Sequence, residues 1–164
     1  MGLFDKLKKN TDTKPNELTS VIDGIVVELS TVNDEVFSSG MMGVGVGIIP
    51  SGDKVVAPGP GTINFVFPAK HAIGLTMDNG AEVIIHVGID TVNLDGKGFE
   101  SFVTDGKKVK RGDLLLKVDL DLIKQAGYES TTMVIITNKD SFSDIKLEHG
   151  PKTISDMIIS LIKS

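Results

Sequence analysis

The stretch that decides the fold reads HAIGLTMDNGAEVIIHVGI, from His71 to Ile89. Two runs rich in β-branched residues flank Asn79-Gly80, a dipeptide that favours a two-residue hairpin turn because both central positions need positive φ. The sequence therefore predicts two antiparallel strands, from about His71 to Asp78 and from Ala81 to Gly88.

Alternation along the second strand separates two faces of the predicted hairpin. One face is apolar and is expected to line the core, and it consists of Val83, Ile85, Val87 and Ile89. The other face carries His86. With a two-residue turn, His86 lies opposite Ile73 and His71 lies opposite Gly88, so both histidines share one face. Their β-carbons are then about 7 Å apart or less, and the two imidazoles can meet. On the first strand this histidine face would include Ile73, Leu75 and Met77.

Outward from the hairpin, short β-branched runs recur between turn residues. They read IVVEL, VGVGII, KVVAP, GTINFVF, LLLKVD and TTMVIIT, and 18 glycines punctuate the chain. This texture predicts an all-β fold, a compact antiparallel sandwich or barrel with short helical turns. The segments expected to be helical are Leu120 to Gly127 and Thr153 to Lys163, and the second also fits a final strand.

Length and composition indicate one globular domain. The 164 residues suit a single core, which we expect to span residues 18–164 after a flexible tail over residues 1–17. In that tail Leu3, Phe4 and Leu7 share one helical face beside three lysines. For residues 2–9 the sequence therefore predicts either a frayed end or a short amphipathic helix that contacts an anionic membrane.

The charge and the absence of cysteine narrow the function classes. A net charge of −5 argues against binding to nucleic acid. Without cysteine the chain has no disulfide and no thiolate metal site, which fits a cytoplasmic location. No apolar run approaches the length of about 20 residues that a membrane span needs.

The two histidines are the candidate chemical centre. A neutral imidazole is available at physiological pH, so the pair fits a phosphoryl acceptor, half of a metal site or a general acid–base pair. As phosphoryl acceptor, one ring would be the nucleophile and the other would donate a hydrogen bond to the phosphoryl oxygens. Two histidines without a third ligand make a poor metal site. The third histidine, His149, lies in a predicted turn and is expected to be solvated.

Beyond the hairpin, several stretches resemble the glucose-type enzyme IIA family of the bacterial phosphoenolpyruvate:sugar phosphotransferase system. The most specific are IHVGIDTVNLDGKGF (residues 85–99) and FPAKHAIGL (residues 67–75). The resemblance covers most of residues 20–140 and continues in NDEVFS (33–38), MMG (41–43), VAP (56–58), GDLLLKVD (112–119) and VIITN (134–138).

The resemblance implies a β-sandwich of the duplicated hybrid motif type and a role in sugar transport. His86 would accept a phosphoryl group from phospho-HPr and His71 would stabilise it. The phosphoryl group would pass to the IIB domain of a glucose-type permease, which also has a IIC domain. Docking to partners would use Asp34, Phe37, Ile73 and Asp90.

The resemblance also implies that no cofactor is required. His71 and His86 would hold zinc only as a site shared with a partner. Some relatives regulate other permeases or kinases. Three positions depart from the family pattern: Ala69 replaces a common Thr, Val44 a common Asp and Met133 a common Pro. The missing hydroxyl at Ala69 is expected to affect phosphoryl transfer.

Two alternatives remain beside the phosphocarrier. A biotin or lipoate carrier domain would need a modified lysine, and Lys54 lacks the flanking residues of such a site. A regulatory binding protein with the same fold but without phosphoryl transfer is favoured only by Ala69. A zinc hydrolase lacks both a third ligand and a general base.

Overall fold

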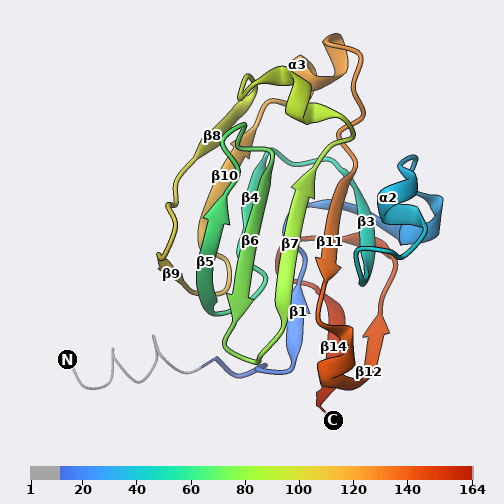
Figure 1. Ribbon diagram of the computed structural model, residues 1–164, viewed down its shortest axis with the longest axis vertical. Helices are drawn as coiled ribbons and strands as arrows, with labels where there is room; N and C mark the ends of the chain where they lie inside the picture. The colour runs from blue at the N-terminus through green and yellow to red at the C-terminus, as the bar shows by residue number, and fades with distance from the viewer. Residues whose placement is uncertain (1–11, 164) are drawn as a thin grey trace.

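The computed structural model describes residues 12–163, and antiparallel strands dominate this range (Figure 1). The largest sheet has eight strands in the order β13-β2-β3-β11-β7-β6-β5-β9. Their bounds are Gly150–Lys152 (β13), Gly24–Glu28 (β2), Val44–Pro50 (β3), Thr132–Ile136 (β11), Glu82–Val87 (β7), Ala72–Met77 (β6), Gly61–Val66 (β5) and Lys108–Val109 (β9).

Two three-stranded sheets complete the sandwich. One has the order β1-β14-β12 and the other β4-β10-β8. Their bounds are Glu17–Thr19 (β1), Met157–Lys163 (β14), Phe142–Leu147 (β12), Lys54–Val56 (β4), Leu114–Val118 (β10) and Phe99–Ser101 (β8). Every strand pair in the described chain is antiparallel, which confirms the all-β prediction.

Helices are short, as predicted. The α-helices are α2 (Glu35–Ser38) and α3 (Leu120–Gln125), and the 3-10 turns are η1 (Leu29–Thr31), η2 (Thr91–Leu94) and η3 (Lys139–Ser141). Helix α3 confirms the predicted helix over 120–127. The C-terminal segment, which fitted either a helix or a strand, is strand β14. Figure 1 shows α3 at the top of the view and α2 beside β3 at the right.

The predicted two-residue hairpin turn is wrong by one residue. The N–H of Met77 donates to the carbonyl of Ala81, and the N–H of Gly80 donates to the carbonyl of Met77, so the loop has three residues. Only Gly80 takes positive φ, at +96°, as in a turn followed by one left-handed residue. Asn79 uses its side chain instead, accepting a hydrogen bond from the N–H of Ala81.

This one-residue shift of the register changes which residues face the core. His86 pairs with Ala72, and Ile85 pairs with Ile73. The side chains of Ile73, Leu75 and Met77 therefore point inward and are at most 2% exposed. The prediction that these three share the histidine face is wrong, whereas the inward face of Val83, Ile85 and Val87 is confirmed.

A second, smaller apolar cluster covers the outer face of the large sheet. It consists of Leu29, Val32, Phe37, Ile89, Met133 and Ile135, with Met42 packed against it. Gly47 makes room for this layer, because a β-carbon there would lie 2.7 Å from Val32 Cγ2. The cluster holds η1 and α2 against the sheet next to His86. Ile89 belongs here and not to the main core.

The described part of the expected tail contacts the body of the protein. Strand β1 begins at Glu17, and Arg111 forms a two-pronged ion pair with Asp12. The amphipathic segment predicted over residues 2–9 lies outside the described residues. No helix in the described range is long and apolar enough to cross a membrane.

Candidate functional site

The candidate site is formed by two imidazole rings at one end of β6 and β7. His86 lies on the outer face of β7, beside Ala72 in the register. The ring of His71, from the turn before β6, lies 4.9 Å from the ring of His86, measured between centroids, at 83°. The predicted proximity of the two histidines is therefore present, although the predicted register that led to it is not.

Aromatic rings flank the histidine pair on both sides. Phe37, from α2, lies 4.9 Å from His86, and Phe67, after β5, lies 5.5 Å from His71. Phe65 continues the row 5.1 Å beyond Phe67. Phe65 covers Gly74, where a β-carbon would lie 2.4 Å from its ring atoms. The histidines thus have an apolar surrounding built from three segments of the chain.

The end of β7 turns sharply after His86. Gly88 has φ +84°, and a β-carbon there would lie 2.3 Å from Thr91 Cγ2. The buried hydroxyl of Thr91 donates to the carbonyl of Val87. Asp90 follows in a left-handed conformation and is exposed. This turn brings the carboxylate of Asp90 near the ring of His86.

Burial keeps both rings neutral at physiological pH. Loss of hydration, and after it the nearby His71, lower the pKa of His86 to about 4. The backbone of Gly88 and the carboxylates of Asp34 and Asp90 act weakly in the opposite direction. Burial also lowers the pKa of His71, which is 3% exposed. Each ring therefore offers one N–H donor and one nitrogen lone pair.

The two nitrogens of each ring differ in their surroundings. Nδ1 of His71 and Nδ1 of His86 are buried and have no hydrogen-bond partner within the described chain. This leaves Nε2 as the ring atom through which each histidine can meet another molecule. Imidazole nitrogens in such a setting can act as nucleophile, as hydrogen-bond donor or as metal ligand.

The predicted docking residues do not all lie at the site. Asp34 caps α2 by accepting a hydrogen bond from the N–H of Val36, and it lies near enough to His86 to influence its pKa. Asp90 also lies near enough to His86 to influence its pKa, and Phe37 contacts the ring of His86 directly. Ile73 is fully buried in the main core, so its predicted role in docking is wrong. The register error placed it on the surface.

Two residues without a predicted role support the site. Phe67 contacts His71, and Thr91 fixes the turn after β7. The position of Phe67 could have been inferred from the Phe67-Pro68 pair. Proline favours the second position of a turn, so the residue before it lies at the end of a strand. Within residues 12–163 no three His, Cys, Asp or Glu side chains gather into a metal site.

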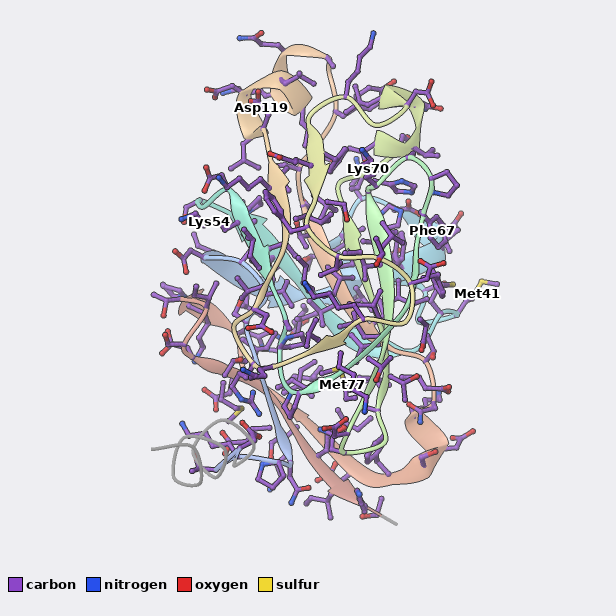
Figure 2. The ribbon with its side chains drawn as sticks, turned by 90° about the vertical axis from the view of Figure 1, so that its left-hand side faces the viewer. Met41, Lys54, Phe67, Lys70, Met77 and Asp119 are labelled. Atoms are coloured by element: carbon purple, nitrogen blue, oxygen red, sulfur yellow. The ribbon has the colours of Figure 1, made fainter. Side chains whose placement is uncertain are left out.

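Exposed apolar side chains lie on the segments from which the site is built. They are Val36, Met41, Phe67 and Val92, and each is between 39% and 83% exposed. Val36 and Met41 belong to or follow α2, Val92 belongs to η2, and Phe67 contacts His71. Figure 2 shows Met41 and Phe67 on the same side of the molecule. Exposed patches of this kind are typical of contact surfaces.

Comparison with known proteins shows the family of this chain. Residues 16–142 match the family described as phosphoenolpyruvate-dependent sugar phosphotransferase system, EIIA 1. The chain belongs to this family. The resemblance inferred from the sequence is therefore confirmed, and the chain is an EIIA domain, a phosphotransferase component of that sugar transport system.

Relatives and a solved structure agree with the assignment. The glucose-specific EIICBA component of Streptococcus pneumoniae is 47% identical over 132 residues, which are 80% of this chain and 18% of that protein. The glucosamine-specific EIICBA component of Bacillus subtilis is 54% identical over 125 residues, which are 76% of this chain and 20% of that protein. The chain thus spans about a fifth of the length of these relatives.

The fold matches a solved EIIA structure. Glucose permease IIA from Mycoplasma capricolum superposes with a TM-score of 0.82 at 35% identity, covering 87% of this chain and 93% of that one. The match confirms the predicted β-sandwich. Of the three positions that depart from the family pattern, Ala69 and Met133 are buried, and Val44 begins β3.

Proposed function

We propose that this EIIA domain carries a phosphoryl group on His86, taking it from phospho-HPr and passing it to the IIB domain of a glucose-type permease. The observation that carries the proposal is the pair of neutral imidazoles in contact at 4.9 Å. A nucleophile and a hydrogen-bond donor stand side by side in an apolar surrounding, which is what positioning and charge stabilisation in phosphoryl transfer require.

Acceptance of the phosphoryl group needs the lone pair of His86 Nε2. With the proton of the neutral ring on Nδ1, this lone pair attacks phosphorus while the bond from phosphorus to the donor nitrogen breaks. The electron pair of that bond returns to the donor ring. Nδ1 is buried without a hydrogen-bond partner in the described chain, so its proton has no acceptor there during the step. The backbone of Gly88 favours the charged ring that forms when Nε2 bonds to phosphorus.

His71 supports the acceptor without forming a bond to phosphorus. Its neutral ring can donate the Nε2 proton to a phosphoryl oxygen, and the surrounding Phe67 and Phe37 exclude water from the contact. A hydrogen bond to a charged oxygen is stronger in such a site than in water. In the onward step a partner's thiolate attacks phosphorus, and His86 leaves as a neutral ring.

The surface around the histidines supports docking of a basic partner. Val36, Met41, Phe67 and Val92 supply exposed apolar area. Asp34 and Asp90 supply carboxylates at the rim, where arginines of HPr or of a IIB domain would find partners. Apolar anchors with charges at the edge are the usual composition of such interfaces.

Three further expectations remain predictions. His71 and His86 offer two of the four ligands that zinc takes, so a zinc site would need two more from a partner, and no step above requires a metal. Regulation of other permeases or kinases, and membrane contact through residues 2–9, stay predictions. A cytoplasmic location follows from the proposed partners. The alternative of a regulatory protein without transfer activity depends on Ala69 alone.

Phosphorylation in a reconstituted relay tests the proposal. The protein is mixed with phosphoenolpyruvate, enzyme I and HPr, and an acid-labile adduct is followed by intact mass for the wild type, His86→Gln, His71→Gln and His149→Gln. We expect an adduct on the wild type and His149→Gln, none on His86→Gln, and an adduct on His71→Gln that passes slowly to IIB. No adduct on the wild type, with HPr shown to be charged, would favour the regulatory alternative.

A further inference from the structure

The residue before His71 has a backbone conformation that its side chain does not favour. Lys70 has φ +62°, in the left-handed region where Gly, Asn and Asp are common and lysine is not. The other non-glycine residues with positive φ in the described chain are two aspartates, Asp90 and Asp95. A lysine in this region is held there by its surroundings, and such residues concentrate at functional sites.

The turn that contains Lys70 repeats the turn at the other end of β6. In the β6–β7 loop, the N–H of Gly80 donates to the carbonyl of Met77 at 2.9 Å. In the β5–β6 loop, the N–H of Lys70 donates to the carbonyl of Phe67 at 2.7 Å. Lys70 therefore fills the left-handed position that Gly80 fills in the other loop. Figure 2 shows Lys70 in the upper part of the view and Met77 in the lower part.

The two loops differ by one residue, and that residue is His71. In the β6–β7 loop the residue after Gly80 pairs with Met77 at once. In the β5–β6 loop the N–H of Phe67 reaches past His71 to the carbonyl of Ala72, at 3.0 Å. His71 is thus an additional residue in the loop, comparable to the extra residue of a β-bulge, and such residues re-aim a side chain.

The extra residue takes His71 out of the alternation of β6. Residues 73, 75 and 77 face the core, and a regular strand would turn His71 to that side as well. Its carbonyl still accepts a hydrogen bond from the N–H of Val87 at 2.7 Å. Its ring, however, lies against His86 on the outer face. The change of side occurs directly after the left-handed residue.

We propose that Lys70 is a positioning residue, whose left-handed backbone and not its charge directs the ring of His71 against His86. This inference deepens the proposed phosphoryl transfer and rests on it for the activity readout. The geometry of the histidine pair is a second readout that does not depend on phosphorylation.

Three variants separate the backbone from the charge. Lys70→Gly removes the charge and permits the left-handed backbone, so the ring pair stays and Tm rises by roughly 2 to 4 °C. Lys70→Arg keeps both properties. Lys70→Val removes the charge and is the residue type least suited to positive φ. In Lys70→Val we expect His71 to leave His86 and the rate of phosphoryl transfer to the IIB domain to fall roughly tenfold to a hundredfold.

The titration of His86, followed by NMR, reports the ring pair directly. Its pKa of about 4 depends on burial and on the neighbouring His71. We expect this pKa to stay near 4 in Lys70→Gly and Lys70→Arg, and to move toward 6.5 in Lys70→Val. A matched control is Gly112→Val, at φ +85° with nothing within 4 Å of an added β-carbon. It lowers Tm by backbone strain alone and should leave the titration and the rate unchanged.

Two results would overturn the inference. The first is a Lys70→Val variant that behaves like Gly112→Val, with a lower Tm but an unchanged His86 titration and rate. Lys70 would then affect stability alone. Lys70→Gly would lose the rate as Lys70→Val does, if the charge were what matters. If the wild type itself accepts no phosphoryl group, the proposed function fails, and the His86 titration in the variants still decides the positioning role.

Discussion

The ring of Phe37 packs against the ring of His86 with their centroids 4.9 Å apart and their planes at 54°. Phe37 is 6% exposed and belongs to the cluster that holds α2 on the sheet. A phenylalanine from a short helix therefore supplies part of the burial that lowers the pKa of His86. The small outer cluster and the chemistry of the histidine are physically coupled.

Replacement of Phe37 is expected to change stability and titration together. Phe37→Ala should lower the free energy of unfolding by about 3 to 5 kcal/mol. It should also raise the pKa of His86 toward 6.5, because burial is the largest cause of the low pKa. Phe37→Leu, which keeps most of the apolar volume, should cost about 1 kcal/mol and leave the pKa low. Urea unfolding and NMR titration measure both quantities. A low pKa in Phe37→Ala would contradict the coupling.

Stability is expected to fall as the pH decreases from about 6.5 to about 4. The unfolded chain binds a proton at His86 below about 6.5, whereas the folded protein binds it only below about 4. Acid therefore favours unfolding, by about 3 kcal/mol at pH 4. In His86→Gln this contribution should vanish. Urea unfolding at pH 4.5, 5.5 and 7 compares the two proteins, and a difference between them that is constant with pH would argue against a buried neutral ring.

A hydroxyl at position 69 is expected to speed phosphoryl transfer. Ala69 is 9% exposed and lies two residues before His71, within the Phe67–Lys70 turn. Ala69→Thr adds a donor there, and Ala69→Val adds the same volume without one. One added hydrogen bond of about 1 kcal/mol predicts a roughly fivefold faster transfer for Thr than for Val. Equal rates in single-turnover transfer to a IIB domain would show that the hydroxyl has no role in this chain.

Arg111 is expected to anchor the described N-terminal segment. Its guanidinium donates to both carboxylate oxygens of Asp12 and to the carbonyls of Lys14, Glu17 and Pro58. Arg111→Met should lower the free energy of unfolding by about 2 to 3 kcal/mol, and the partly exposed Asp12→Asn by about 1 kcal/mol.

A double-mutant cycle checks the anchor. Because Arg111→Met already removes the partner, adding Asp12→Asn should cost almost nothing more. Arg111 also lowers the pKa of Asp12, so the contribution of this pair is present at neutral pH and is lost as acid protonates Asp12. Fully additive losses in urea unfolding would show that the two side chains do not interact in solution.

The sequence was sufficient for the fold class because its strand and turn signals are local. The β-branched runs and the alternation of Val83, Ile85 and Val87 predicted the strands and the inward face, and the short segment over 120–127 predicted α3. The hairpin pattern also singled out His71 and His86, and the family resemblance then gave each histidine its role. These features depend on neighbouring residues, so they can be read along the chain.

The register and the route by which His71 reaches His86 could not be read in the same way. Asn79-Gly80 fits both a two-residue turn and a three-residue loop with one left-handed glycine, and only the packing of both strands selects the second. The two histidines meet because an extra residue follows Lys70. The wrong turn length misplaced Ile73 on the histidine face. The extra residue, which brings His71 against Phe67, left no signal in the sequence, so Phe67 received no role.

The most direct test of the central claim asks which atom bears the phosphoryl group. The protein is labelled with ¹⁵N in its histidines and charged through enzyme I and HPr, and the nitrogen bonded to phosphorus is identified by its ¹⁵N shift and its coupling to ³¹P. We predict a bond to Nε2 of His86, with Nδ1 of the same ring protonated and His71 unmodified. A phosphoryl group on His71, or on Nδ1 of His86, would contradict the account.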